Sequence, residues 1–152
     1  MTSSILRLVP VFVIAGCGGS QSMNSSPDLA PATVTELPQG CQSGVTGAML
    51  YADVLGHNCA SRTACHGAAQ PMEYSVTSAA ALQTMWVNKP SIEVPSMPYV
   101  TPNDVDHSYV MYKVMGQMGK VGGSGNRMPN GGPYLTDAEV CELVSWIQGG
   151  AN

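Results

Sequence analysis

The stretch "LTDAEVCELVSWIQGG", residues 135–150, carries the clearest structural signal in this sequence. Thr136 is followed three residues later by Glu139, which is the pattern of a capping box at the start of a helix. Apolar residues then recur at helical spacing as far as Gly149 and Gly150, a pair that favours termination. We therefore predict a terminal helix whose buried face is formed by Val140, Leu143, Val144 and Ile147.

Upstream of this helix, the sequence predicts short helices separated by long irregular loops. Apolar positions at helical spacing indicate a helix over residues 45–55 and two weaker helices over residues 78–87 and 108–118. The segment 90–104 contains four prolines and is expected to be an extended loop. With 152 residues, 17 glycines, 11 prolines and no useful β-alternation, the chain indicates one modest domain.

Composition excludes some classes of function. The formal net charge is −4 and only 11% of residues are charged, so nothing indicates a nucleic-acid partner. Hydrophobic residues make up 44% of the chain, which supports a real core. The sequence shows no paired carboxylates and no nucleophile beside a base, so it does not point to an enzyme.

The N-terminus has the features of a targeting signal. Arg7 precedes the apolar run "LVPVFVIA" (8–15), which is shorter than the roughly 20 residues of a membrane span. Small residues then lead to a cysteine in "IAGC" (14–17). This order resembles the bacterial lipoprotein signal, which implies cleavage of residues 1–16 and a lipid on Cys17.

The lipoprotein resemblance implies a domain organisation and a location. Residues 17–40 are rich in Ser, Pro, Thr and Gly and are expected to form a flexible linker, followed by a folded domain over residues 41–152. The expected location is the bacterial cell envelope, where disulfides persist. Because Gly18 rather than aspartate follows Cys17, the outer membrane is preferred over the inner membrane.

Candidate binding chemistry lies in "NCASRTACHG", residues 58–67. Cys65 is followed by His66, as in the C-x-x-C-H sequence that attaches c-type haem. Five residues, however, separate Cys59 from Cys65. The stretch is therefore compatible with a widened haem attachment site, a disulfide loop or part of a metal site.

A haem iron beside a proximal histidine would need a second axial ligand, which in electron-transfer proteins is usually methionine. Two Met-Pro steps offer one. Met128 is preferred because the capped terminal helix follows it closely, and Met97 is its rival.

The order of these features resembles a class I cytochrome c domain: a helix, Cys…Cys-His-Gly, loops, Met-Pro, Leu-Thr-Asp-x-Glu and a helix ending in Trp-Ile. More narrowly, it is similar to the small cytochrome c-like lipoproteins of myxobacteria and planctomycetes. The matching segments, within residues 45–151, are "SYVMYK" (108–113), "RMP" (127–129) and "WIQGGA" (146–151).

This resemblance implies an all-α fold with crossing first and last helices and long Gly- and Pro-rich loops. It also implies one covalent haem c, with thioether bonds at Cys59 and Cys65, His66 as proximal ligand and Met128 as distal ligand. Because the first and last helices cross in this family, the two remaining cysteines, Cys41 and Cys141, could come within bonding distance, which makes a disulfide between them possible. The expected function is one-electron transfer to an unidentified redox protein, by a cytochrome anchored to the membrane through its lipid.

Other interpretations of the same residues remain open. Cys59 and Cys65 could instead form a disulfide in a haem-free, disulfide-stabilised lipoprotein domain that binds a partner. A zinc site would need a further ligand besides these two thiolates and His66, and His57 is the nearest candidate. A peroxidase-like haem would require an open or labile sixth position on the iron.

Overall fold

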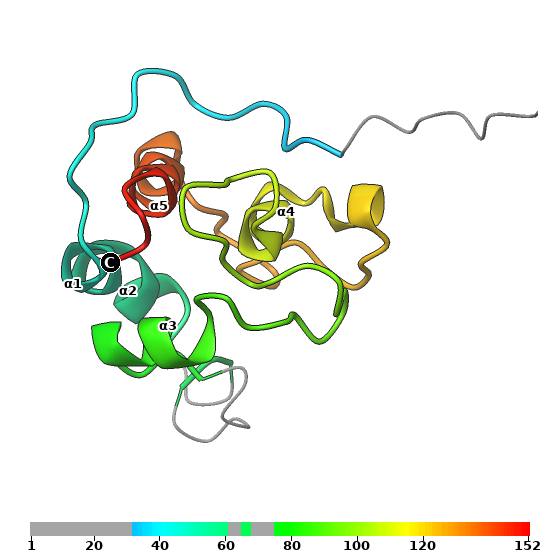
Figure 1. The fold of residues 1–152 in the computed structure, drawn as a ribbon, viewed down its shortest axis with the longest axis horizontal. Coiled ribbons are helices and arrows are strands. Elements are labelled where there is room, and N and C mark those ends of the chain that lie inside the picture. Colours follow the sequence, from blue (N-terminus) through cyan, green and yellow to red (C-terminus); the bar gives the residue numbers. More distant parts are fainter. Residues whose placement is uncertain (1–31, 61–64, 68–74) are drawn as a thin grey trace, which may run out of the picture.

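The structure is a computed structural model that describes residues 32–60, 65–67 and 75–152 (Figure 1). The predicted signal peptide, Cys17 and the first part of the predicted linker lie outside the described residues, as does most of the spacer between Cys59 and Cys65. None of the helices in the described ranges is long and apolar enough to cross a bilayer.

The described chain forms short helical elements joined by loops. Near its start, α1 (Gly47–Leu50), a π-helical turn η1 (Tyr51–Leu55) and α2 (Gly56–Asn58) follow one another without a break. The remaining elements are α3 (Ala79–Met85), α4 (Tyr109–Met115), the 3-10 helix η3 (Met118–Val121) and α5 (Asp137–Gln148). Both α1 and η1 contact α5.

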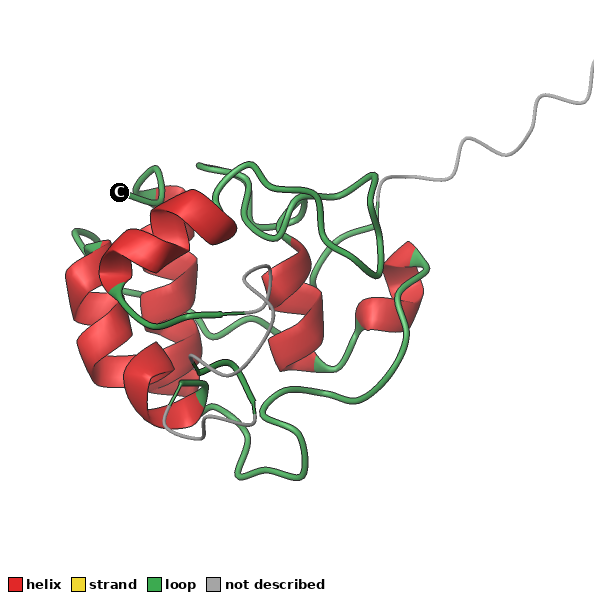
Figure 2. Cartoon of the chain, turned by 90° about the horizontal axis from the view of Figure 1, so that it is seen from below, coloured by secondary structure: helices red, strands yellow, loops and turns green. Residues whose placement is uncertain are grey.

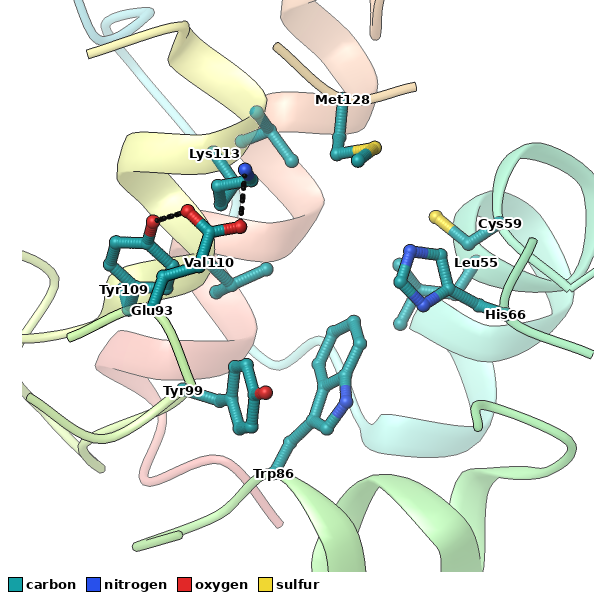
Figure 3. Close-up of a pocket in the computed structure, with 11 residues that line it drawn as sticks. Leu55, Cys59, His66, Trp86, Glu93, Tyr99, Tyr109, Val110, Lys113 and Met128 are labelled. Carbon is teal, nitrogen blue, oxygen red and sulfur yellow. Dashed lines mark hydrogen bonds and ion pairs between the residues drawn. The ribbon is translucent and has the colours of Figure 1, made fainter. Parts of the chain in front are cut away.

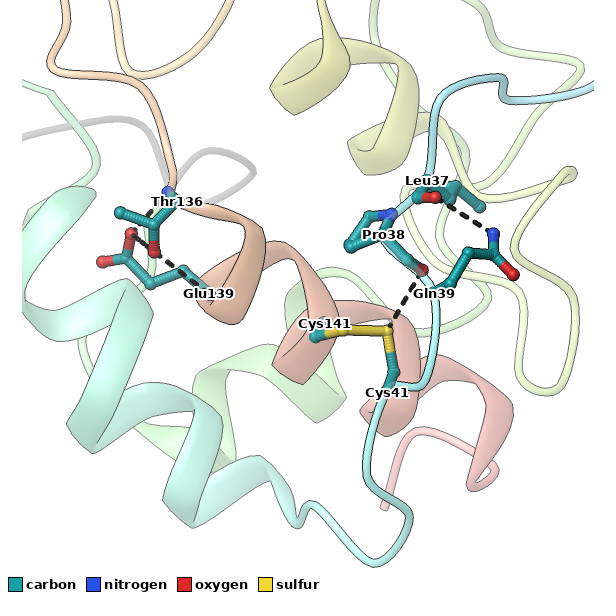
Figure 4. The surroundings of a disulfide bond; sticks show 7 residues. All are labelled: Leu37, Pro38, Gln39, Cys41, Thr136, Glu139 and Cys141. Carbon is teal, nitrogen blue, oxygen red and sulfur yellow. Dashed lines mark hydrogen bonds between the residues drawn. A yellow bond between two sulfur atoms is a disulfide. The ribbon is translucent and has the colours of Figure 1, made fainter.

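The predicted terminal helix is confirmed as α5, with its capping box. The Glu139 backbone N–H donates to the Thr136 hydroxyl at 3.3 Å, and the Thr136 N–H donates to the Glu139 carboxylate at 2.7 Å (Figure 4). These reciprocal bonds satisfy N–H groups that a helix start leaves without intrahelical partners. At the other end, Gly149 is the C-cap and Gly150 has a φ of 92°, a conformation that favours glycine.

The predicted first helix exists, but it contains a π-turn that its apolar spacing did not reveal. Gly56 follows this turn directly, and a Cβ at that position would lie 2.8 Å from the carbonyl oxygen of Tyr51. Glycine therefore permits the close backbone approach of the wider turn. The Tyr51 hydroxyl donates to the Thr77 carbonyl at 2.8 Å, which connects the turn to the start of the α3 region.

The predicted all-α fold of class I cytochrome c type is wrong. Helices cover about 38% of the structure, and long loops connect and surround them (Figure 2). No β-strand forms in the described ranges, but three isolated β-bridges do, so the fold is not clearly all-α. The bridges pair Val87 with Val100, Pro90 with Pro98, and Thr101 with Asp104.

The loops are part of the core, which explains the error. Val94, Val100, Val105 and Leu135 all lie in irregular segments, and each is buried. Short helices alone would leave much apolar surface exposed, so the extended segments complete the burial. The all-α fold was implied by the resemblance to class I cytochrome c, and the helical periodicity that accompanied it does not detect buried residues in irregular segments.

Residues 32–35, within the predicted linker, contact α4, the segment ahead of it and the start of η3. The Tyr112 hydroxyl donates to the Ala32 carbonyl at 2.7 Å, and the Val34 N–H donates to the Asp106 carboxylate at 2.8 Å. Gln117 donates to the Thr35 carbonyl at 2.7 Å. Val34 is buried. Residues ahead of Cys41 therefore pack on the domain.

A disulfide joins Cys41 to Cys141, 100 residues apart in the sequence (Figure 4). It fixes the segment ahead of α1 to the first turns of α5. A second junction lies at the other end of α5, where the Gly47 N–H and the Trp146 indole N–H both donate to the Asn152 carbonyl, at 2.7 and 3.1 Å. The disulfide thus fastens the segment ahead of α1 to α5, and the hydrogen bonds to Asn152 fasten the start of α1 to the C-terminal residues.

Candidate functional site

Side chains from distant parts of the sequence line one pocket (Figure 3). Its cavity volume is about 110 Å³. Most of the lining is apolar or aromatic, with a few polar groups. The lining residues are Leu55, Cys59, His66, Trp86, Glu93, Tyr99, Tyr109, Val110, Lys113, Val114 and Met128.

Three of the four predicted haem-binding residues line this pocket: Cys59, His66 and Met128. Cys65, the fourth, is exposed and is not among the lining residues. Met97, the rival ligand, also lies outside the lining; its side chain packs against the core. Met128 is thus the Met-Pro methionine that shares a pocket with His66.

Cys59 and His66 are held on one wall by backbone hydrogen bonds. The Cys59 N–H donates to the Leu55 carbonyl at 2.9 Å, so the cysteine directly continues α2. The His66 N–H donates to the Cys59 carbonyl at 3.3 Å, and the Val76 N–H donates to the His66 carbonyl at 2.7 Å. The His66 ring meets the Trp86 ring edge-on, with centroids 6.4 Å apart.

Glu139 fixes the end of α2 that leads into Cys59. Besides its role in the capping box of α5, its carboxylate accepts a hydrogen bond from the Asn58 side chain at 2.7 Å. One carboxylate therefore connects the start of the terminal helix with the residue before Cys59. Burial alone would raise the pKa of Glu139, but the hydrogen bonds from Thr136 and Asn58 outweigh it and lower the pKa.

Cys59 and Cys65 are both free thiols. Burial, then the neighbouring Cys65 and then Glu139, raise the pKa of Cys59 to about 11. Cys59 is therefore a neutral thiol at physiological pH. Thiolate is the nucleophile in thiol–disulfide exchange, so this environment slows oxidation of Cys59 to a disulfide.

Met128 is placed by the last turn of α4. Its N–H donates to the Lys113 carbonyl at 3.0 Å, and the Arg127 side chain donates to the Val114 carbonyl at 2.7 Å. Gly116 ends α4 with a φ of 70°, and a Cβ there would lie 3.1 Å from Arg127. Arg127 also lies over the Tyr134 ring, 4.2 Å from its centroid. The loop that carries Met128 thus satisfies carbonyls at a helix end.

A polar cluster on the wall opposite Cys59 was missed by the sequence analysis (Figure 3). The Lys113 ammonium lies 2.8 Å from one oxygen of Glu93, and Tyr109 donates a hydrogen bond to the other. The Ser124 N–H also donates to that second oxygen, at 3.1 Å. The available signal was the i, i+4 spacing of Tyr109 and Lys113, which puts both on one face of a helix.

The charge state of this cluster follows from its contacts. Burial opposes ionisation of Glu93, but the hydrogen bonds from Lys113 and Tyr109, followed by that from Ser124, outweigh it and lower the pKa of Glu93. Burial, reinforced by the bond to Glu93, raises the pKa of Tyr109. Glu93 is therefore a carboxylate and Tyr109 a neutral hydrogen-bond donor at neutral pH.

The donor set fits a haem iron better than a zinc ion. An imidazole and a thioether, the pair that binds iron in electron-transfer cytochromes, face the same largely apolar pocket. A zinc site would need more nitrogen, sulfur or oxygen ligands close together. In the described part of the chain, no three His, Cys, Asp or Glu residues form such a group.

No protein-family model matches this chain, and no curated protein or solved structure shows significant similarity to it.

Proposed function

We propose that this protein is a c-type cytochrome, anchored by lipid to the bacterial cell envelope, that transfers single electrons to and from a partner protein. The observation that carries the proposal is the shared pocket of Cys59, His66 and Met128. Met128 is 62 positions beyond His66 (128 − 66), so their common pocket results from folding and not from sequence proximity.

Each residue has a proposed role. Cys59 and Cys65 would form thioether bonds to the haem, His66 would be the proximal iron ligand, and Met128 the distal one. The iron would supply the chemistry, cycling between its ferric and ferrous states. The soft thioether of Met128 favours the ferrous state and so raises the potential.

The remaining lining residues would orient the group and exclude water from it. Trp86 and Tyr99 stack with their ring centroids 6.1 Å apart, and Trp86 also supports the His66 ring. Leu55 is fully buried, and Val110 and Val114 are almost so. These side chains make a low-dielectric wall that disfavours water near the iron.

Covalent haem attachment is the direct test. The full-length chain is expressed with the c-type maturation machinery, purified and examined by absorption spectroscopy and intact mass. The expected result is a Soret band and a mass increase of one haem that survives denaturation. Cys59→Ser and Cys65→Ser variants should each shift the band of the pyridine complex, since each leaves one vinyl group unreacted. A mature protein with no Soret band would exclude the proposal.

The same preparation separates electron transfer from haem catalysis. Electron transfer requires Met128 to stay on the iron, so the reduced protein should not bind carbon monoxide readily. Rapid binding would indicate an open sixth position and a peroxidase-like or sensing role.

A further inference from the structure

Building on the proposed haem binding, we infer that Lys113 binds a carboxylate group of the tetrapyrrole, and that Glu93 is the positioning residue that holds Lys113 in place. The cluster of Glu93, Lys113 and Tyr109 has no role in attaching the group or in ligating its iron. It nevertheless forms the polar part of a lining that is otherwise mostly apolar.

The position of the cluster matches the chemistry of the ligand. In this tetrapyrrole, the vinyl groups that react with cysteines and the two carboxylate groups lie at opposite edges of the ring. Cys59 is on one wall of the pocket, and Lys113 and Glu93 are on the wall across from it (Figure 3). A ring attached at Cys59 would therefore direct its acidic edge toward Lys113.

One N–H donor of the Lys113 ammonium has no acceptor among the described residues. Its ammonium has three N–H donors, and described residues accept two of them: Glu93 at 2.8 Å and the Ser124 carbonyl at 3.0 Å. No other acceptor for it lies among the residues that the structure describes. Its side chain is only 12% exposed, so a third acceptor would gain a charge-assisted bond in a largely desolvated place.

Glu93 holds Lys113 in place but does not fully neutralise the positive charge of its ammonium. Both oxygens of Glu93 already accept hydrogen bonds, one from Lys113 and the other from Tyr109 and Ser124. The negative charge is thus shared among three donors. Glu93 restrains a flexible lysine in one geometry, which reduces the ordering cost when a ligand carboxylate binds.

The test compares two ligands that differ only in this group. Iron(III) mesoporphyrin IX carries the carboxylates, and its dimethyl ester does not; both lack vinyl groups, so neither forms thioethers. Each is titrated into the haem-free full-length chain, with quenching of tryptophan fluorescence as the readout, because Trp86 lines the pocket. The acid should bind about tenfold more tightly than the ester, the effect of one charge-assisted hydrogen bond.

Matched variants assign the preference to Lys113. Lys113→Met should remove it, lowering the affinity for the acid about tenfold while leaving that for the ester unchanged. The unchanged ester affinity also shows that the pocket is intact. Lys113→Arg should keep the preference. Lys120→Met is the control, because Lys120 bonds to Thr33, Thr35 and Gln117 and does not line the pocket; it should behave like the wild type.

The Glu93→Gln variant distinguishes the role of Glu93 in positioning Lys113 from the effect of its negative charge. The amide oxygen still accepts from Lys113, but the competing negative charge is gone, so the preference for the acid should increase. Equal affinity of the wild type for both ligands, or an undiminished preference in Lys113→Met, would overturn the inference. Neither result depends on thioether formation, so covalent haem attachment can succeed or fail independently of it.

Discussion

Met128 and Lys113 are joined through their backbones: the Met128 N–H donates to the Lys113 carbonyl at 3.0 Å. Lys113, whose ammonium is part of the polar wall of the pocket, therefore also anchors the loop that carries Met128. A shift of α4 would move both groups together. The position of α4 therefore determines where both Lys113 and Met128 lie in the pocket.

Replacing Met128 with leucine should leave the fold intact and change the iron site. The backbone bonds are kept, and a swap of similar volume costs less than about 1.5 kcal/mol. In the haem-loaded protein, we expect complete loss of the long-wavelength absorption band of methionine bound to ferric iron, together with a lower reduction potential. Met97→Leu is the matched control and should retain the band. The opposite pattern would assign the ligand to Met97.

Removing the disulfide should destabilise the domain strongly. In the chain-entropy model, closing a loop of about 100 residues stabilises a fold by roughly 4–5 kcal/mol, and Cys41 and Cys141 enclose a loop of that size. A Cys41→Ser/Cys141→Ser variant, compared with the wild type by urea unfolding, should show this loss. Adding reductant to the wild type should reproduce it. A loss below about 1 kcal/mol would mean that the enclosed chain stays compact when unfolded.

Gly123 should be intolerant of a side chain. A Cβ at this position would overlap the ring and hydroxyl of Tyr109, a rigid group held by Glu93. Gly123→Ala should therefore lower the free energy of unfolding by about 2–3 kcal/mol, as overpacking does. Gly119→Ala is the control, since nothing lies within 4 Å of its added Cβ, and it should change stability by less than about 0.5 kcal/mol. Equal effects of the two substitutions would contradict the close packing of Gly123 against Tyr109.

Cys59 should react slowly with alkylating agents in the folded, haem-free protein. With its pKa raised from 9.0 to about 11, its thiolate fraction at pH 8 is about a hundredfold lower than in the unfolded chain. Iodoacetamide labelling of the wild type, with and without urea, measures this ratio when peptide mass spectrometry distinguishes Cys59 from Cys65. A ratio near one would show that the Cys59 thiol is solvated.

The same group contributes to the pH dependence of stability. Between pH 9 and 11 the unfolded chain loses the Cys59 proton first, so the folded state binds more protons. Stability from this group is therefore complete below pH 9 and declines as the pH rises to about 11. Urea midpoints across this range should fall less in a Cys59→Ser variant than in the wild type.

Local sequence signals predicted much of the helical structure. Thr136 and Glu139 specify the start of α5 through bonds between residues three apart, and Ser78 is the N-cap of α3. Such signals depend only on neighbouring residues, so they can be recognised in a single sequence. The π-turn at Tyr51–Leu55 is not, because its apolar residues also satisfy an ordinary helical pattern.

The site was only partly predictable for the same reason. His66 and Met128 were recognisable from the residues beside them, Cys65 and Pro129. Glu93, in contrast, lies in a proline-rich loop 20 residues before Lys113, and nothing local marks it as a partner. Its role arises from the packing of that loop against α4, which depends on the whole fold.

The packing of residues 32–35 against α4 and η3 would limit how far a lipid anchor lets the domain move. If Cys17 carries a lipid, 15 residues (32 − 17) separate it from the first described contact, at Ala32, and not the 24 (41 − 17) that separate it from Cys41. Fully extended, 15 residues span at most about 54 Å, against about 86 Å for 24. The volume within which the tethered domain could meet a redox partner would scale with the cube of that length and fall to about one quarter.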